Sequence, residues 1–265
     1  MGFALSQDAT AEQNSNSAVG VNRCIAHEDG EPNLFIWSHK NLKFSKNALR
    51  TSSSKLEKSH KALLNRADRA LNEGPYSVVF KTSVPPSGSK HDYYSIAPYW
   101  WPNPNNKSGL PYIRRDGERN PESKSSASDR VALNHLSSNV STLALAAYFS
   151  DDNRYAKKAS ELIRVWFLDK KTRMNPNLNF AQAIPGKITG RSVGIIDTYD
   201  LVKIVDSINI LVYLGQLSSI EIEVLKQWFT EYTLWLITSD IGKEERRRSN
   251  NHGLYYDVQV AIFSA

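Results

Sequence analysis

The sequence contains a single cysteine, Cys24, so no disulfide can form within the chain. It also has no run of about 20 apolar residues, the length that a membrane-spanning helix needs. Its histidines and its cysteine are not grouped at the spacing of a zinc site. A glycine-rich phosphate loop and a Gly-x-Ser-x-Gly elbow are missing as well. We therefore expect no membrane insertion, no metal site and no cofactor.

The composition is that of an ordinary globular protein. The 265 residues are enough for one large domain or two small ones, and 40% of them are hydrophobic and 23% charged. The formal net charge of +6 attracts polyanions, which leaves nucleic acid, anionic polysaccharide and acidic lipid open as partners. The basic residues are not ordered along one helix face, however, so binding to nucleic acid is not predicted.

Hydrophobic periodicity predicts helices over most of the chain. Residues 1–33 are polar and are predicted to form a flexible leader. Apolar residues then recur at helical spacing over 45–72 and in several segments after residue 130, including 195–214. Ser218 and Glu221 match a capping box and predict the start of a further helix. No strand alternation competes with this pattern, so the predicted fold class is all-α.

Repeated pairs of antiparallel helices can build a bundle, a solenoid or a closed toroid. The last helix is predicted over residues 250–265, and its pattern runs to Ala265 without a cap or a polar exit. A helix in that position exposes an apolar face that lacks a partner. We therefore expect the domain, residues 34–265, to be truncated at its C-terminus.

The segment 75–128 differs from the rest of the chain. It holds most of the eleven prolines, so regular helix is not expected there. Its central part, residues 93–102, is rich in Tyr and Trp, whereas disordered regions are poor in aromatic residues. The sequence thus predicts a long, ordered loop that carries aromatic rings.

Two groups of polar residues are candidates for chemistry. Asn250, Asn251 and His252 stand together just before the last predicted helix, and an asparagine often caps a helix. A cap accounts for one amide but not for a second amide beside an imidazole. Gln182 and Arg191 flank a predicted turn with glycines nearby, which allow a ligand close to the backbone. The alternative for this pair is a connecting loop with a surface arginine.

Three blocks of the sequence, at residues 92–104, 179–197 and 250–259, carry a family resemblance. They begin with DYYSIAPYWW, NFAQAIPG and NNHGLYYD respectively. In content and order they resemble the alginate-lyase superfamily. The resemblance spans residues 34–265 and implies an (α/α) toroid, here an incomplete barrel of antiparallel helix hairpins with a long loop rich in proline and aromatic residues.

The resemblance also implies catalytic roles. Members of the family cleave uronic-acid polymers by β-elimination, in which a proton leaves the carbon beside a carboxylate, so the enzyme must neutralise the developing charge. Asn251 matches the family's neutralising amide, and His252 matches a histidine that is a base or a second donor. The arginine and tyrosine that the family uses further along would follow residue 265, because Tyr255 and Tyr256 lie in a different block.

On the substrate side, sugar rings present flat C–H faces on which aromatic side chains stack. Tyr94, Trp100 and Trp101 are the residues predicted to do so. Gln182 and Arg191 are predicted to bind uronate carboxylates, the arginine through paired N–H donors.

The sequence therefore predicts a lyase that acts on alginate, polymannuronate or glucuronan and leaves a 4,5-unsaturated sugar end. The alternative is a non-catalytic carbohydrate-binding or inactive lyase-like protein. An anionic polysaccharide is the expected partner, and the oligomeric state is not predicted. Large polymers are met outside the cytoplasm, so an extracellular or periplasmic location is expected, although residues 1–13 show no signal peptide.

Overall fold

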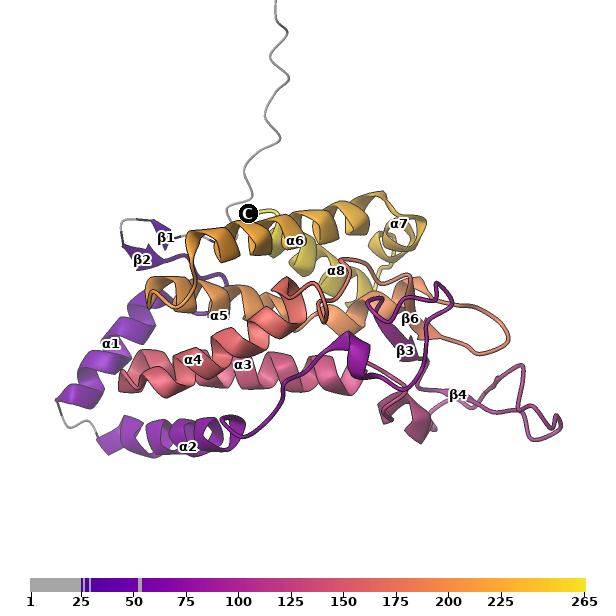
Figure 1. Ribbon diagram of the computed structural model, residues 1–265, viewed down its shortest axis with the longest axis horizontal. Helices are drawn as coiled ribbons and strands as arrows, with labels where there is room; N and C mark the ends of the chain where they lie inside the picture. Colours follow the sequence, from indigo (N-terminus) through magenta and orange to yellow (C-terminus); the bar gives the residue numbers. More distant parts are fainter. Residues whose placement is uncertain (1–24, 26, 29, 52–53) are drawn as a thin grey trace, which may run out of the picture.

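The computed structural model describes residues 25, 27–28, 30–51 and 54–265, which fold mainly into helices (Figure 1). The α-helices are α1 (His39–Arg50), α2 (Ser54–Ala70), α3 (Arg130–Ser150), α4 (Asn153–Ile163), α5 (Leu201–Tyr213), α6 (Ser219–Thr238), α7 (Asp240–Arg246) and α8 (Asn251–Phe263). Shorter helical turns are η1 (Val78–Phe80), η2 (Pro121–Lys124), η3 (Arg164–Leu168) and η4 (Ser192–Thr198). The strands are β1 (His27–Glu28), β2 (Glu31–Pro32), β3 (Tyr94–Ile96), β4 (Trp100–Trp101), β5 (Ile113–Arg114) and β6 (Phe180–Ala183). The all-α prediction is confirmed.

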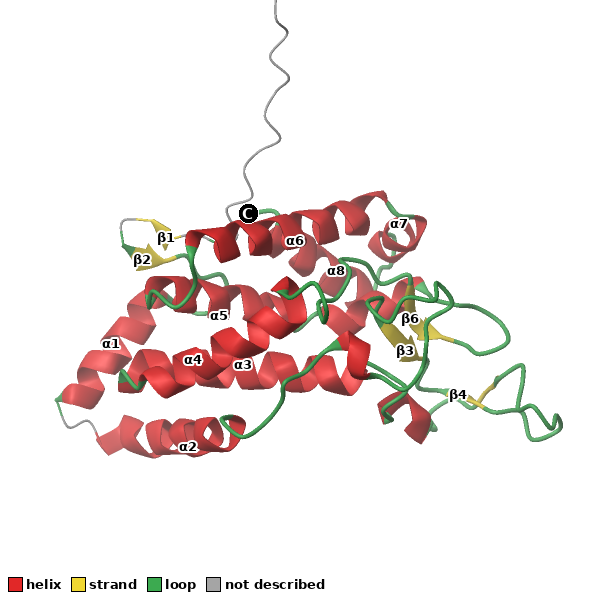
Figure 2. Cartoon of the chain, viewed as in Figure 1, coloured by secondary structure: helices red, strands yellow, loops and turns green. Residues whose placement is uncertain are grey.

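Helix α3 lies at the centre of the structure and packs against α2, α4 and α5. Its buried side chains recur every three or four residues, as in Leu133, Leu136 and Val140, which places them on one side of the helix. Helix α5 contacts α8, which in turn contacts α6 and α7. The long loops gather at one end of this helical body, where β3, β6 and α7 also lie (Figure 2).

Helix α6 confirms one prediction in detail. Ser218 Oγ accepts the Glu221 N–H, and a Glu221 carboxylate oxygen accepts the Ser218 N–H, so the predicted capping box is formed. None of the helices in the described part of the chain is both long and apolar enough to cross a bilayer.

Other helix boundaries differ from the prediction. The single helix predicted over 45–72 is two helices: α1 starts earlier, after the N-cap Ser38, and ends at Arg50 with Thr51 as its C-cap, and α2 starts at Ser54. The helix predicted over 195–214 begins instead as the 3-10 turn η4, and α5 starts only at Leu201. Helix α7 was not predicted. It starts at the N-cap Ser239, and Gly242 permits the tight turn, since a Cβ there would lie 1.8 Å from the Leu236 carbonyl oxygen.

The predicted leader lies largely outside the described residues, but the part next to the domain packs on α5. Ile25 is fully buried. The Asp206 carboxylate accepts the backbone N–H groups of Phe35, Ile36 and Trp37 at 2.8–2.9 Å. This carboxylate therefore ties the chain just before α1 to the middle of the helical body.

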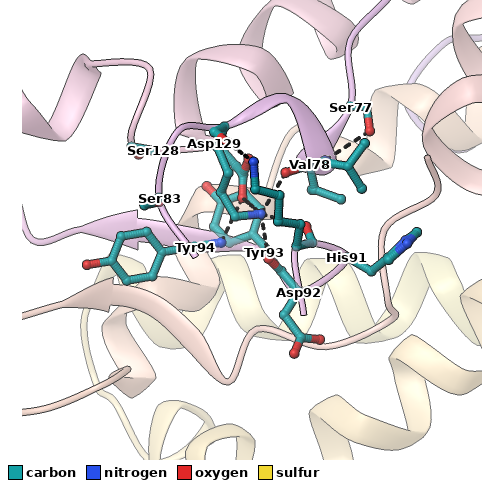
Figure 3. A network of polar contacts seen from close by, with 12 residues as sticks. Ser77, Val78, Ser83, His91, Asp92, Tyr93, Tyr94, Ser128 and Asp129 are labelled. Atoms are coloured by element: carbon teal, nitrogen blue, oxygen red, sulfur yellow. Dashed lines mark hydrogen bonds and ion pairs between the residues drawn. The ribbon is translucent and has the colours of Figure 1, made fainter. Parts of the chain in front are cut away.

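A buried ion pair orders the proline-rich segment (Figure 3). Lys81 Nζ lies 3.0 Å from Asp129 Oδ2, and both side chains are 1% exposed. The ammonium also donates to the carbonyl oxygens of Val78, Lys90 and Asp92. Burial raises the pKa of the Asp129 carboxyl to about 7, and Lys81 opposes that shift. The pair thereby joins the start of α3 to the loop.

The same carboxylate fixes the first strand of the aromatic loop. Asp129 Oδ2 accepts the Tyr94 N–H at 2.8 Å, and the Asp129 N–H donates to the Tyr94 carbonyl oxygen at 2.8 Å. Strand β3 then pairs in parallel with β6, with Tyr94 opposite Phe180 and Ile96 opposite Ala183. Two segments that are distant in sequence, both members of the predicted functional blocks, are in this way brought side by side.

Candidate active site

Gln182 stands at the centre of the β3–β6 pair. Its N–H donates to Ser95 Oγ at 2.8 Å, and its side chain is buried. Its φ of 47° lies in the left-handed region, which is unusual for a residue other than glycine. Such a conformation costs about 1–3 kcal/mol and persists only where the surroundings impose it.

The surroundings of Gln182 are organised by the fully buried carboxylate of Asp197 in η4. Its Oδ2 accepts the hydroxyl of Ser95 at 2.6 Å and that of Tyr93 at 3.2 Å. Its Oδ1 accepts the Gln182 side-chain Nε2 at 3.1 Å and lies 3.6 Å from Arg130 Nε. Burial raises the pKa of Tyr93 well above its ordinary value, so the phenol stays protonated as a donor to this carboxylate.

Arg191 is bound directly by Gln182. Its Nε donates to the Gln182 carbonyl oxygen at 3.0 Å, and its Nη2 donates to the Gln182 side-chain Oε1 at 2.9 Å. Both ends of the Gln182 amide are thus engaged within the protein, by Arg191 and Asp197. Burial lowers the pKa of Arg191, the Asp197 carboxylate opposes that shift, and the nearby cations Arg114 and Arg248 add to it. The predicted pair Gln182 and Arg191 is brought together, with the glutamine holding the arginine.

Two glycines allow this approach. A Cβ on Gly190 would lie 2.0 Å from the Asn179 carbonyl oxygen, and one on Gly194 would lie 2.5 Å from the Ala181 Cβ. The glycines flanking Arg191 therefore let the chain before η4 pack against β6.

His252, in the first turn of α8, rests on a buried carboxylate. Its Nδ1 lies 2.7 Å from Glu245 Oε1, and the Glu245 side chain is fully buried. Glu245 belongs to α7, and a Cβ on Gly253 would lie 1.9 Å from the carbonyl oxygen of Arg248, so glycine is needed for the first turn of α8 to pack against the turn that follows α7. The contact orients the imidazole through Nδ1, and no hydrogen bond engages Nε2 within the described residues.

Asn250 and Asn251 have different surroundings. Asn250 is the N-cap of α8, and its Oδ1 accepts the His252 N–H at 3.0 Å. Asn251 is the first residue of the helix and is exposed, and no hydrogen bond joins its amide to another described residue. The capping role therefore belongs to Asn250, which leaves the Asn251 amide open to solvent beside the imidazole.

Arg248 connects the histidine block to the arginine block. Its Nε lies 3.6 Å from Glu245 Oε2, and its Nη2 donates to the hydroxyl of Ser192 at 3.0 Å. Ser192 directly follows Arg191, and η4, which it begins, contacts β6, α7 and α8. The Gln182–Arg191 pair and the Asn251–His252 pair thus meet around η4.

The aromatic residues lie on the loop beside these blocks. Half-buried Tyr94 and Trp100 pack against a small apolar cluster of Ile96, Ala97, Tyr112 and Ile184. Lys187 Nζ lies 4.7 Å from the centre of the Trp100 ring, so this ring adjoins the turn that follows β6. Trp101 has other neighbours: its Nε1 donates to the Glu118 carbonyl oxygen at 3.0 Å, and Arg115 covers its ring at 5.2 Å. Trp100 is therefore nearer to the Gln182 block than Trp101.

Two functional candidates were missed from the sequence. Glu245 sits in a helix that was not predicted, and Asp197 reads as one more acidic residue in a helical pattern. The proximity of Glu245 to His252 and of Asp197 to Gln182 depends on how the chain turns between its elements. The one signal in the sequence was the short separation of seven residues between Glu245 and His252. The described residues contain no group of three histidine, cysteine or carboxylate side chains that could hold a metal ion.

Taken together, the site offers an exposed amide, an oriented imidazole and a half-buried guanidinium, which suits the binding of a carboxylate and the neutralisation of charge on it.

A family model for alginate lyases matches residues 77–265 of the chain. A crystal structure of an alginate lyase from Bacteroides ovatus superposes with a TM-score of 0.82 at 43% sequence identity. The superposition covers 88% of this chain and 60% of that one, so the chain spans less than two thirds of that protein's length. A comparison with curated proteins finds no match. The helical architecture and the superposition confirm the predicted fold class, and the chain belongs to the alginate lyase family.

Proposed function

We propose that this protein is a polysaccharide lyase that cleaves a uronic-acid polymer by β-elimination, with Asn251 and His252 at the reacting sugar. The observation that carries the proposal is the buried Glu245 carboxylate held 2.7 Å from His252 Nδ1, next to the exposed amide of Asn251. β-Elimination next to a carboxylate needs a group that moves a proton and a donor that neutralises charge. An imidazole oriented by a carboxylate suits the first role, and an exposed amide beside it suits the second.

The chemistry follows from the substrate. Removing the proton on C5 of a uronate places negative charge beside an ionised carboxylate, and the C4–O bond then breaks to leave a 4,5-double bond. In our proposal Asn251 donates its amide hydrogens to that carboxylate. His252, oriented by Glu245, acts through Nε2 as a base or as a second donor. The proton donor to the leaving oxygen is not assigned to a residue of this chain.

Arg191 offers a binding position for the carboxylate of a second sugar of the substrate. Its Nε and Nη2 bind Gln182, while Nη1 has no hydrogen-bond partner among the described residues. We assign Arg191 to a uronate carboxylate and Gln182 to positioning that arginine. Tyr94 and Trp100 supply surfaces on which a sugar ring can stack, and Trp101 does so from its separate position on the loop.

The substrates that fit this proposal are alginate, polymannuronate and glucuronan, all of which carry a carboxylate on every sugar. The net charge of +6 favours their approach. Because polymers of this size are met outside the cytoplasm, we place the protein in an extracellular or periplasmic space.

The test follows the ultraviolet absorbance of the unsaturated product during incubation with polymannuronate, polyguluronate and glucuronan. We expect an absorbance rise with at least one of them. His252→Ala should lower the rate by about 10²- to 10⁴-fold, the usual contribution of a proton-transfer group. His39→Ala is the matched control, because His39 Nδ1 also lies near a carboxylate, 2.9 Å from Glu31 Oε2, on the remote helix α1. Binding of the polymers without any product would favour the non-catalytic alternative.

A further inference from the structure

A basic cavity of about 370 Å³ lies between the aromatic loop and the start of α3. It is lined by Pro98 of the aromatic loop, by Arg119 and the end of η2, and by the first turns of α3. The charged or titratable residues that line it are Arg119, Lys124, Arg130 and His135, and none of its lining residues is acidic. Its volume is at the lower end for small-molecule sites, which suits a single sugar unit.

The positive charge in this cavity is largely uncompensated. Arg119 and Lys124 are exposed, and neither forms an ion pair with a described residue. Arg130 Nε approaches Asp197 only at 3.6 Å. Concave surfaces of one charge sign concentrate oppositely charged ligands.

The nearby carboxylates are occupied elsewhere. Glu122 accepts the Tyr112 hydroxyl at 2.6 Å. Glu73, whose pKa is lowered mainly by its hydrogen bond from Asn139, also accepts the Tyr76 hydroxyl at 2.9 Å. Asp129 is bound to Lys81, as described above. The cavity therefore attracts a carboxylate from outside the chain.

The cavity is linked to the candidate site by the Arg130–Asp197 ion pair and by the hydrogen bonds of Asn120. Arg130 lines the cavity and contacts Asp197, the carboxylate that binds Gln182. On the other side, the Asn120 N–H donates to the Pro98 carbonyl oxygen at 2.7 Å, and Asn120 Nδ2 donates to the Trp100 carbonyl oxygen at 2.8 Å. One wall of the cavity thus belongs to the loop that carries Trp100, and Arg130 links another wall to Asp197, the partner of Gln182.

A second cavity of about 270 Å³ shares Lys124, Val131 and His135 with the first, and its one acidic lining residue, Asp129, is paired with Lys81. Two hollows that share a wall suit an elongated ligand better than a small free anion. A polyuronate is elongated and carries a negative charge on each sugar.

We propose that the basic cavity is a remote subsite for the polyuronate chain, in which Arg119 and Lys124 bind the carboxylate of a sugar away from the bond that is cleaved. This inference rests on the proposed function for its ligand class. Arg130 and the exposed amide of Asn134 complete the lining with donors for the sugar hydroxyls.

The test measures direct binding by titration calorimetry in the His252→Ala background, so that cleavage does not interfere. The probe is polymannuronate, at two salt concentrations. The double variant Arg119→Gln/Lys124→Gln should weaken binding by about tenfold, since it removes two charge-assisted contacts. The control Lys55→Gln/Lys58→Gln removes the same charge from exposed positions on α2 and should change affinity by less than about twofold.

The outcomes separate the possibilities. An equal loss in both double variants shows that only net charge matters and overturns the subsite, as does no loss in either. Inorganic phosphate that binds as well as the polymer, and whose binding alone depends on Arg119 and Lys124, also overturns it. If wild-type protein gives no unsaturated product but the difference between the double variants persists, the proposed lyase function fails while the subsite stands. Unchanged thermal midpoints confirm that the variants are folded.

Discussion

Replacing Glu245 with glutamine tests how the structure prepares His252 for its role. The substitution keeps the size and shape of a fully buried side chain and removes its charge. In the wild type the carboxylate oxygen lies 2.7 Å from Nδ1, and because a carboxylate only accepts hydrogen bonds, it favours the imidazole with its hydrogen on Nδ1. A glutamine can present either its oxygen or its nitrogen to Nδ1, so it no longer selects one tautomer of the imidazole or stabilises the charged ring.

The size of the effect follows from this contact. A hydrogen bond to a charged group contributes about 1.5–3 kcal/mol. If that contribution is lost in the transition state, kcat falls by about 10- to 150-fold. Because Glu245 lies behind His252 and does not face the substrate, KM should change by less than about twofold. Arg248, the other neighbour of Glu245, keeps its bonds to Glu244 at 2.7 Å and to Ser192 at 3.0 Å.

The assay measures initial rates of formation of the unsaturated product on polyuronate. Glu31→Gln is the matched control, since it removes the carboxylate beside His39 without touching the site. Circular dichroism and the thermal midpoint establish that each variant is folded. A folded Glu245→Gln protein with the wild-type kcat, or one no slower than Glu31→Gln, refutes the supporting role of Glu245.

Three further predictions follow from single contacts. Gly253→Ala places a Cβ 1.9 Å from the Arg248 carbonyl oxygen, so it should lower stability by about 1–3 kcal/mol in urea unfolding and reduce activity as the start of α8, which carries His252, shifts away from the turn at Arg248. Arg164 lowers the pKa of Glu221 to about 2. The resulting stabilisation is present above the ordinary value of 4.5 and is lost as the pH falls through about 2, so the deficit in thermal midpoint of Glu221→Gln should be clear at neutral pH and vanish near pH 2. Trp100→Ala should raise KM by about 5- to 10-fold with little change in kcat, which steady-state kinetics on polyuronate will show.

The helices that the sequence predicts well are those with local signals. In α6, the capping box of Ser218 and Glu221 and the apolar spacing agree, so both type and start were predicted. Helix α7 has only seven residues and depends on the N-cap Ser239 and on Gly242 fitting against Leu236, so no periodicity could indicate it. The division between α1 and α2 falls in a polar stretch whose pattern does not mark an end.

In the candidate site, too, the sequence predicts what local patterns mark and misses what depends on packing between helices. Asn251 and His252 were named because they stand next to one another in a block that resembles a family motif. Glu245 and Asp197 were missed because their roles depend on which helices meet. Arg119 and Lys124 contributed only to net charge in the sequence, and their shared cavity depends on how η2 packs against α3.

The central claim is that Asn251 neutralises the uronate carboxylate during elimination. The most direct measurement compares the rate of Asn251→Ala with that of the wild type on an ionised polyuronate and on the same polymer with its carboxylates converted to methyl esters. The account predicts a loss of about 10²- to 10³-fold on the ionised polymer, as for the removal of one oxyanion donor, and a much smaller loss on the ester, which carries no negative charge before the proton leaves and becomes a monoanion where the ionised sugar becomes a dianion. Equal losses on the two polymers, or none on either, would contradict it.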